Sequence, residues 1–185
     1  MAPLTIATIT HSAIVGQIGI CACPGRRLPP GIAGQHCRDL DADMETISDF
    51  GARAVLTLME VGELDWAAVP LARLRAAVQA RRMQSIYLPI IDQEAPDHHW
   101  ERRWREQRDQ LHLLLRTGGN LVIHCRGGRG RAGMVAARLL IEAGETPQMA
   151  MQLVRSARPG AIETVAQEQY LMALPTHETA MGRFP

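Results

Sequence analysis

Cys125 lies at the mouth of a glycine-rich loop that leads into a helical pattern. The stretch NLVIHCRGGRGRAGMVAARLL, residues 120 to 140, runs from an apolar segment through glycines and arginines into that pattern. Glycines in such a loop let successive backbone N–H groups converge on one point, and the following helix adds the positive end of its dipole. We therefore predict an anion-binding loop formed by Arg126, Gly127, Gly128, Arg129, Gly130 and Arg131.

The chemistry that suits this loop is nucleophilic attack on a phosphomonoester. The positive field of the loop would stabilise a thiolate at Cys125, and Arg131 brings a planar guanidinium that can bind two phosphate oxygens. Attack by the sulfur would give a phosphocysteine, which water would then hydrolyse. The spacing C-x5-R is a weak signal by itself in a chain rich in arginine, but its position between a strand and a helix strengthens the prediction.

The same stretch carries a family resemblance. HCRGGRGRAG resembles the signature H-C-x-x-G-x-x-R-[ST]-G of the cysteine-dependent protein tyrosine and dual-specificity phosphatases. Further stretches resemble, in order and spacing, the cyclin-dependent kinase-associated phosphatase family: IGICACPGRR, GELDWAAVP, LPIIDQEAPD and VRSARPGAIETVAQEQYL. The resemblance covers roughly residues 16 to 175. It implies an α/β phosphatase domain with Cys125 as nucleophile and Arg131 as phosphate clamp.

Hydrolysis of a phosphate ester also needs a proton donor for the leaving oxygen. A carboxylic acid on a mobile loop can give that proton and then take one back from water. We expect Asp92 in this role, because it follows the strand pattern SIYLPI and because the family places its acid at the matching position of LPIIDQEAPD. Asp97 is the competing candidate, although it also fits the N-cap of the helix containing Trp100. Glu94 is a minor candidate.

Four residues are expected to support the reaction without carrying it. His124 should face the interior and hold the backbone and thiolate of Cys125 by hydrogen bonds. By the resemblance, position 132 should hold a serine or threonine whose hydroxyl stabilises the departing thiolate, but this chain has Ala132. Position 163 should hold a glutamine that positions the hydrolytic water, but this chain has Glu163. Gln167 is retained and offers a substitute amide. Both departures concern the second chemical step, so slow turnover or an unusual substrate is expected.

The elements that must position these residues alternate between short apolar strands and amphipathic helices. Strand patterns cover residues 18–23, 53–58, 85–90 and 120–125, with an edge strand at 5–10. Helical patterns cover residues 39–52, 70–83, 96–120, 132–143, 147–155 and 163–174. The alternation predicts a single α/β domain over residues 1–185, with a mostly parallel four- to five-stranded sheet and helices on both faces. Cys125 and Asp92 would then lie at the carboxyl ends of strands, where ligands bind.

Composition narrows the classes of function and partner. The chain has 185 residues and a net charge of +1, which favours neither nucleic acid nor a membrane surface as a partner. All 20 basic residues are arginine, so lysine Schiff-base chemistry is excluded. The first twenty residues are too polar for a spanning helix, so we expect a cytoplasmic protein without stable membrane insertion.

The remaining cysteines raise the question of a metal site. Cys21, Cys23, His36 and Cys37 have the residue types of a zinc site, but cysteines alternating in an apolar strand are more often buried thiols. We therefore expect neither a metal nor another cofactor.

Three functions remain open for the predicted loop, and they differ in the phosphorylated molecule that it binds or in whether that molecule is hydrolysed. The first is a phosphorylated protein or peptide carrying phosphotyrosine or phosphothreonine. The second is an inositol phosphate or phosphoinositide, because Arg126 and Arg129 occupy positions where related phosphatases neutralise additional phosphates. The third is a module that binds phosphorylated partners without turning them over. A sulfurtransferase is less consistent with the loop length.

Two arginines beyond the loop have two possible roles. Arg155 and Arg158 either extend the positive pocket or lie on a solvated helix end.

Overall fold

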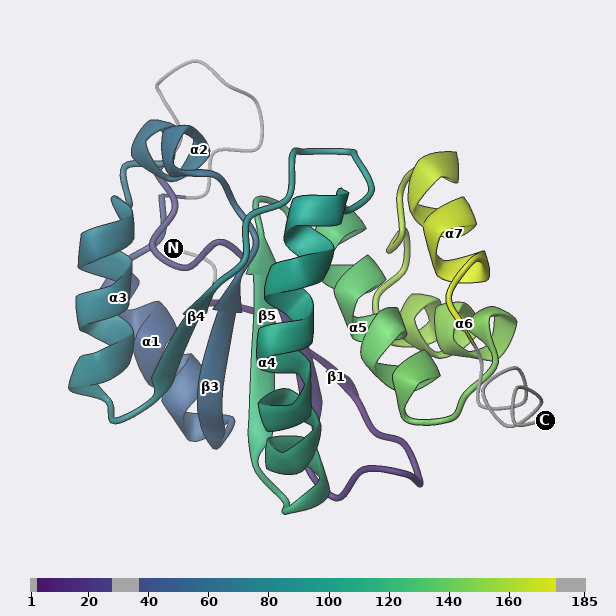
Figure 1. The fold of residues 1–185 in the computed structure, drawn as a ribbon. Coiled ribbons are helices and arrows are strands. Elements are labelled where there is room, and N and C mark those ends of the chain that lie inside the picture. Colours follow the sequence, from purple (N-terminus) through teal and green to yellow (C-terminus); the bar gives the residue numbers. More distant parts are fainter. Residues whose placement is uncertain (1–2, 28–36, 176–185) are drawn as a thin grey trace, which may run out of the picture.

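The central feature of the fold is a five-stranded sheet. The computed structural model describes residues 3–27 and 37–175, and the strands lie in the order β1-β2-β5-β3-β4. They are β1 (Ala7–Ile9), β2 (Ile18–Ala22), β3 (Ala52–Thr57), β4 (Gln84–Tyr87) and β5 (Asn120–Cys125). The edge strand β1 runs antiparallel to β2, and the other neighbours pair in parallel (Figure 1). The predicted mostly parallel sheet with an additional edge strand is confirmed.

Seven helices in the described residues surround this sheet. They are α1 (Leu40–Asp49), α2 (Val61–Trp66), α3 (Leu71–Ala80), α4 (His98–Arg116), α5 (Gly130–Glu142), α6 (Pro147–Ala157) and α7 (Val165–Met172). Figure 1 shows α1 and α3 on one side of the sheet, and α4 and α5 on the other.

Alternation along the strands divides the core into two apolar clusters. In β5, Leu121 and Ile123 pack with residues of α4 and α5, whereas Val122 between them packs with residues of α1 and α3. This division follows from the strand period of two, which sends successive side chains to opposite faces. A sheet covered on both faces favours apolar residues at successive positions, which is why β2 and residues 121–123 of β5 read as continuous apolar runs.

Several predicted boundaries differ from the structure, and one helix was not predicted. The helices expected over 39–52, 70–83 and 96–120 end earlier, at Asp49, Ala80 and Arg116. The strand expected over 85–90 ends at Tyr87, although Leu88 and Ile90 stay buried and donate backbone hydrogen bonds to Thr57 and Leu58. The last helix begins at Val165 rather than at 163, because the Thr164 side chain caps it. Helix α2 is only six residues long, too short to show a helical period in the sequence.

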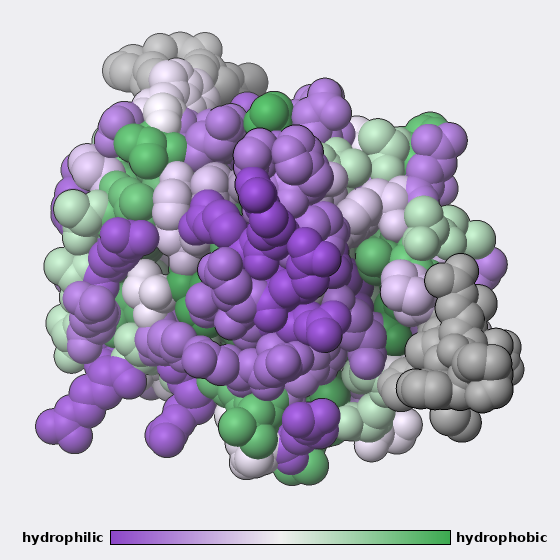
Figure 2. All heavy atoms as spheres, viewed as in Figure 1, coloured by the Kyte–Doolittle hydropathy of each residue, from purple (hydrophilic) through white to green (hydrophobic). Residues whose placement is uncertain are grey.

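The outer surface of α4 is strongly hydrophilic. Its buried residues, Trp100, Trp104, Leu111 and Leu115, lie on one side of the helix, and Figure 2 shows charged and polar side chains over its opposite side. Within residues 3–27 and 37–175, no helix combines the length and the apolar character needed to cross a bilayer.

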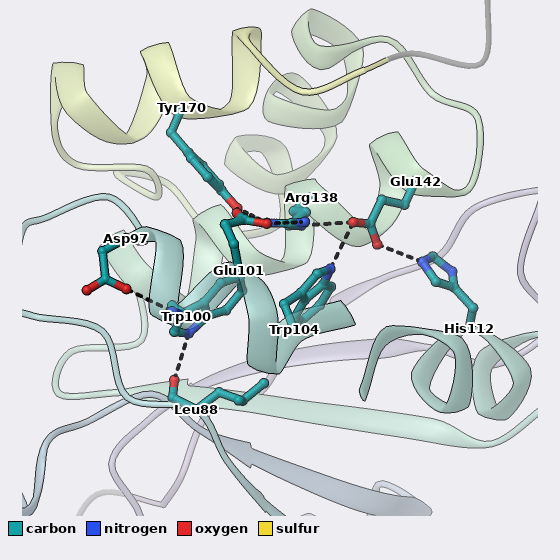
Figure 3. A network of polar contacts seen from close by, with 9 residues as sticks. All are labelled: Leu88, Asp97, Trp100, Glu101, Trp104, His112, Arg138, Glu142 and Tyr170. Atoms are coloured by element: carbon teal, nitrogen blue, oxygen red, sulfur yellow. Dashed lines mark hydrogen bonds and ion pairs between the residues drawn. The ribbon is translucent and has the colours of Figure 1, made fainter. Parts of the chain in front are cut away.

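A buried arginine in α5 links this helix to α4 and α7. Arg138 is only 4% exposed, and its guanidinium pairs with Glu142 at 2.8 Å and with Glu101 of α4 at 3.0 Å. It also contacts the hydroxyl of Tyr170 in α7 and lies 4.9 Å from the Trp104 ring (Figure 3). These contacts fix the middle of α5, the helix whose first turn follows Cys125.

Glu142 provides the second half of this network. Its carboxylate accepts hydrogen bonds from Trp104 Nε1 at 2.8 Å and binds His112 Nε2 at 2.9 Å, in addition to Arg138 (Figure 3). Partial burial opposes its ionisation, but the bonds from His112 and Arg138 outweigh this effect and lower the pKa of Glu142. The carboxylate therefore remains ionised at pH 7 and keeps its ion pair with Arg138.

Replacing Arg138 tests how much this network stabilises the fold. Arg138→Met leaves Glu101 and Glu142 without their shared cation, so the free energy of unfolding should fall by about 3 kcal/mol. Urea unfolding at pH 7 measures this change in the free energy of unfolding. The matched control is Arg105→Met on the exposed side of α4, which should change the value by less than about 0.5 kcal/mol. A loss below about 1 kcal/mol in Arg138→Met would show that the network contributes little.

Candidate active site

Cys125 is the last residue of β5 and lies nearly buried at the carboxyl end of the sheet. Only 3% of it is exposed, and α5 begins five residues later at Gly130. We call residues 126–131 the cradle loop. The loop lies directly against β2: Gly128 has φ +65°, and a Cβ there would lie 2.4 Å from the Cys21 carbonyl. Only glycine satisfies both the backbone angle and the contact.

Arg131 returns from the first turn of α5 and is almost completely buried. It is 1% exposed, and Nη1 donates to the carbonyl of Ile90 at 2.9 Å. The fork faces Glu63, with Nη1–Oε2 at 2.5 Å and Nη2–Oε1 at 2.8 Å. Nη2 also lies 2.8 Å from Asp92. Arg131 Nε is buried without a hydrogen-bond partner among the described residues, which leaves this donor for an anion in the cradle loop.

Glu63 is a site residue that the sequence analysis missed. It lies in α2, where its carboxylate also accepts the backbone N–H of Glu60 at 3.0 Å. Partial burial raises its pKa, but the hydrogen bonds from Arg131 and the Glu60 backbone outweigh this effect and lower it overall. The one sequence signal was the Glu60–Glu63 spacing, which resembles a capping box. That spacing could predict a helix start, but not a bond to a residue 68 positions away.

Asp92 bridges two arginines of the cradle loop. One carboxylate oxygen lies 2.8 Å from Arg131 Nη2, and the other lies 2.9 Å from Arg126 Nη2. The structure therefore brings Asp92 to the loop, as expected from its position after a strand. Asp97 instead accepts the backbone N–H of Trp100 at 2.8 Å and caps α4. Glu94 is exposed.

Two strained residues hold acidic side chains beside the cradle loop. Gln93 follows Asp92 with φ +67°, and Ile162 precedes Glu163 with φ +60°. A positive φ is unfavourable for a β-branched residue such as isoleucine, and it persists only where the surroundings enforce it. Thr164 Oγ1 donates to the Gln93 carbonyl at 3.0 Å and joins the two segments. The two carboxylates are thus positioned by connected loops.

Glu163 contacts the cradle loop directly. Its Oε2 accepts the backbone N–H of Gly130 at 2.9 Å, and its own N–H donates to Gln167 Oε1 at 2.9 Å. Gln167 is fully buried, and its Nε2 has no partner among the described residues. A carboxylate thus holds one amide of the predicted anion-binding loop, and an anion entering the loop would have to compete with it.

His124 and Ala132 are both buried behind the site. His124 faces the interior as expected, but its ring Nε2 bonds to Thr57 Oγ1 at 2.9 Å rather than to the Cys125 thiol. Complete burial lowers the pKa of His124 to about 4, so the ring is neutral at pH 7. Ala132 is fully buried in the first turn of α5 and brings no hydroxyl to the site.

The other cysteines lie in the core or at the surface. Cys21 and Cys23 are fully buried, and burial raises the pKa of Cys23 to about 12. Cys37 is exposed, and His36 lies outside the described residues. Among residues 3–27 and 37–175, no group of three His, Cys, Asp or Glu side chains is arranged to hold a metal ion.

The order of the sheet and the return of an arginine from α5 to a cysteine at the end of β5 define a cysteine-dependent phosphatase. Comparison with known proteins agrees. A family model described as PTP-SAK, a Swiss Army Knife protein DSP-PTPase phosphatase domain, matches residues 28–171. The chain belongs to this dual-specificity and protein tyrosine phosphatase family.

Individual relatives support the same assignment. Cyclin-dependent kinase inhibitor 3 of Sus scrofa is 32% identical over 157 residues, which cover 83% of this chain and 69% of that protein. The protein of the same name from Homo sapiens is 31% identical over 157 residues, with the same coverage. A crystal structure of kinase associated phosphatase, with its catalytic cysteine replaced by serine, superposes with a TM-score of 0.79 at 28% identity. It covers 92% of this chain and 93% of that one. The predicted family is confirmed, and the chain is a cysteine-dependent protein phosphatase.

Glu63→Gln tests the ion pair with Arg131 through its pH dependence. Because the folded state lowers the pKa of Glu63, the pair contributes its full stabilisation at pH values above 4.5, the ordinary pKa of this carboxyl group. This contribution is lost as the pH falls through the lowered folded value. The variant should therefore be less stable than the parent by about 1–3 kcal/mol at pH 7, and the difference should shrink below pH 4.5.

Urea unfolding of both proteins from pH 3 to 8 gives this difference directly. The control is Glu106→Gln, an exposed carboxylate on α4, which should show no pH-dependent difference. A constant difference at every pH for Glu63→Gln would contradict the assigned ion pair.

Proposed function

We propose that the protein hydrolyses phosphomonoesters through a phosphocysteine on Cys125. The observation that carries this proposal is that Cys125, Arg131 and Asp92 meet at one loop, although Asp92 comes from the segment that follows β4. In the first step the Cys125 sulfur attacks phosphorus, the S–P bond forms and the ester P–O bond breaks. Asp92 gives its proton to the leaving oxygen.

The second step regenerates the enzyme. Water attacks phosphorus and gives its proton to the Asp92 carboxylate, while the S–P bond breaks and the thiolate leaves. Ala132 lacks a hydroxyl to stabilise that thiolate, and Glu163 has a carboxylate where relatives have an amide. We assign both residues to this step, with Gln167 supporting Glu163 through the 2.9 Å bond to its backbone.

Arg131 binds the phosphoryl group in both steps. Its contact with Glu63 holds the guanidinium plane in one orientation, which reduces the entropy lost when substrate binds. Phosphate oxygens would replace Asp92 on Nη2 and take up the unpartnered Nε donor. The Asp92 carboxyl would then turn toward the leaving oxygen.

We propose a phosphorylated protein or peptide as the substrate, with phosphotyrosine or phosphothreonine as the reacting residue. The matched relative called kinase associated phosphatase supports this substrate class. Arg126, one of the two arginines that suggested an inositol phosphate, pairs with Asp92 at 2.9 Å and becomes available to a further phosphate only when Asp92 turns away. Free cysteines at 21, 23 and 125 fit a reducing compartment, and we place the protein in the cytoplasm.

Replacing the nucleophile tests the covalent mechanism. Cys125→Ser should abolish hydrolysis of an aryl phosphate, because the hydroxyl is a far weaker nucleophile than the thiolate. The variant should still bind tungstate with an affinity close to that of the parent, because the loop and Arg131 are unchanged. Steady-state kinetics and calorimetric titration measure the two properties. Turnover near that of the parent would refute the phosphocysteine.

Replacing the proposed acid gives a second, independent test. Asp92→Asn should slow turnover of a phosphotyrosine peptide by about a hundredfold and remove the basic limb of the pH–rate profile. The effect should shrink for an aryl phosphate whose leaving group needs no proton. The control is Asp97→Asn, since asparagine caps a helix as well as aspartate does. If this control loses the basic limb and Asp92→Asn keeps it, the acid is Asp97.

A further inference from the structure

The outer side of the cradle loop is held by arginines that do not belong to the loop. Arg158 donates from Nε to the Gly128 carbonyl at 2.9 Å and from Nη2 to the Gly127 carbonyl at 3.1 Å. Arg26 donates from Nη1 to the Arg126 carbonyl at 3.1 Å. Arg158 therefore neither lines the pocket nor lies free at a helix end, the two alternatives left open by its sequence context.

These bonds determine where the amides of the loop point. In a planar trans peptide, the C=O and the N–H point in opposite directions. The Gly127 carbonyl shares its peptide with the Gly128 N–H, and the Gly128 carbonyl shares its peptide with the Arg129 N–H. Because Arg158 binds both carbonyls from outside, both N–H groups point away from it. Two donors of the anion-binding loop are thus aimed by one guanidinium.

Arg158 is itself held on a rigid turn. It follows the last residue of α6, its N–H donates to the Val154 carbonyl at 2.8 Å, and its carbonyl accepts from the Ala161 N–H at 3.0 Å. Gly160 has φ +76° in this turn. Arg155 donates to the Ala161 carbonyl at 3.2 Å and closes the turn from the other side. The backbone that carries the Arg158 side chain is therefore fixed by hydrogen bonds of its own.

We propose that Arg158 is a positioning residue for phosphoryl transfer, which aims and polarises the Gly128 and Arg129 amides. This inference rests on the proposed function of the cradle loop. A cation on a carbonyl strengthens the N–H of the same peptide as a donor, because hydrogen bonds in a chain polarise one another. The planar fork of arginine suits two adjacent carbonyls, whereas a lysine ammonium acts as a point charge. Arg158 thus acts on the phosphate through the peptides between them.

Arg158→Ala and Arg158→Lys test this role in the full chain. Arg158→Ala should lower kcat/KM for an aryl phosphate by about ten- to a hundredfold, because misdirected donors stabilise the transition state less. Its affinity for vanadate should fall by a similar factor. Arg158→Lys should lie between the parent and Arg158→Ala, because it keeps the charge but not the paired geometry. Arg105→Ala on the exposed side of α4 is the control and should change neither quantity.

Vanadate affinity separates this proposal from simple destabilisation. A purely structural role would lower the melting temperature of folded Arg158→Ala but leave its vanadate affinity within about twofold of the parent, and that result would overturn the proposal. If Arg158→Ala does not fold, Arg158→Lys gives the same comparison. If the parent protein binds vanadate but hydrolyses no phosphoester, the proposed function fails, while the vanadate affinities of the variants still decide the role of Arg158.

Discussion

The burial of one positive charge, on Arg131, organises the rest of the site. A guanidinium that is 1% exposed is unfavourable unless anions and carbonyls surround it. Glu63 from α2, Asp92 from the segment after β4 and the Ile90 carbonyl supply these partners. Segments that are far apart in the sequence are therefore drawn to the same point. Their assembly also fixes where a phosphate can bind, because the same guanidinium is the proposed phosphate ligand.

The cradle loop is constrained along its whole length. At its start, Cys125 belongs to the central strand of the sheet, and at its end Gly130 begins α5. Arg138, two turns further along α5, ties this helix to α4 and α7. Arg158 and Arg26 hold the carbonyl side of the loop, and Glu163 binds an amide at its end. A loop held at so many points costs little additional order when an anion binds.

The parts of the fold and site that follow from local sequence were predictable. The apolar strands, the glycines after Cys125 and the helix beginning near Arg131 are local signals, and the structure has all of them. The family signature also placed Asp92 near the loop. Glu63 and Arg158 were not assigned because their partners lie 68 and about 30 positions away in the sequence. Pairing over such separations depends on how the helices pack, and no local periodicity records it.

The absence of space beside Gly128 has a consequence for how this site can evolve. Since a Cβ at this position would lie 2.4 Å from the backbone of Cys21 in β2, the inner dimension of the cradle loop is tied to the spacing between β2 and β5. Neighbouring strands keep a nearly constant separation, because hydrogen bonds between their backbones set it. Substitutions around the opening of the cradle loop can therefore change which phosphorylated molecules reach it. The size of the anion that fits is set by the spacing of the strands, so substitutions at the surface change it little.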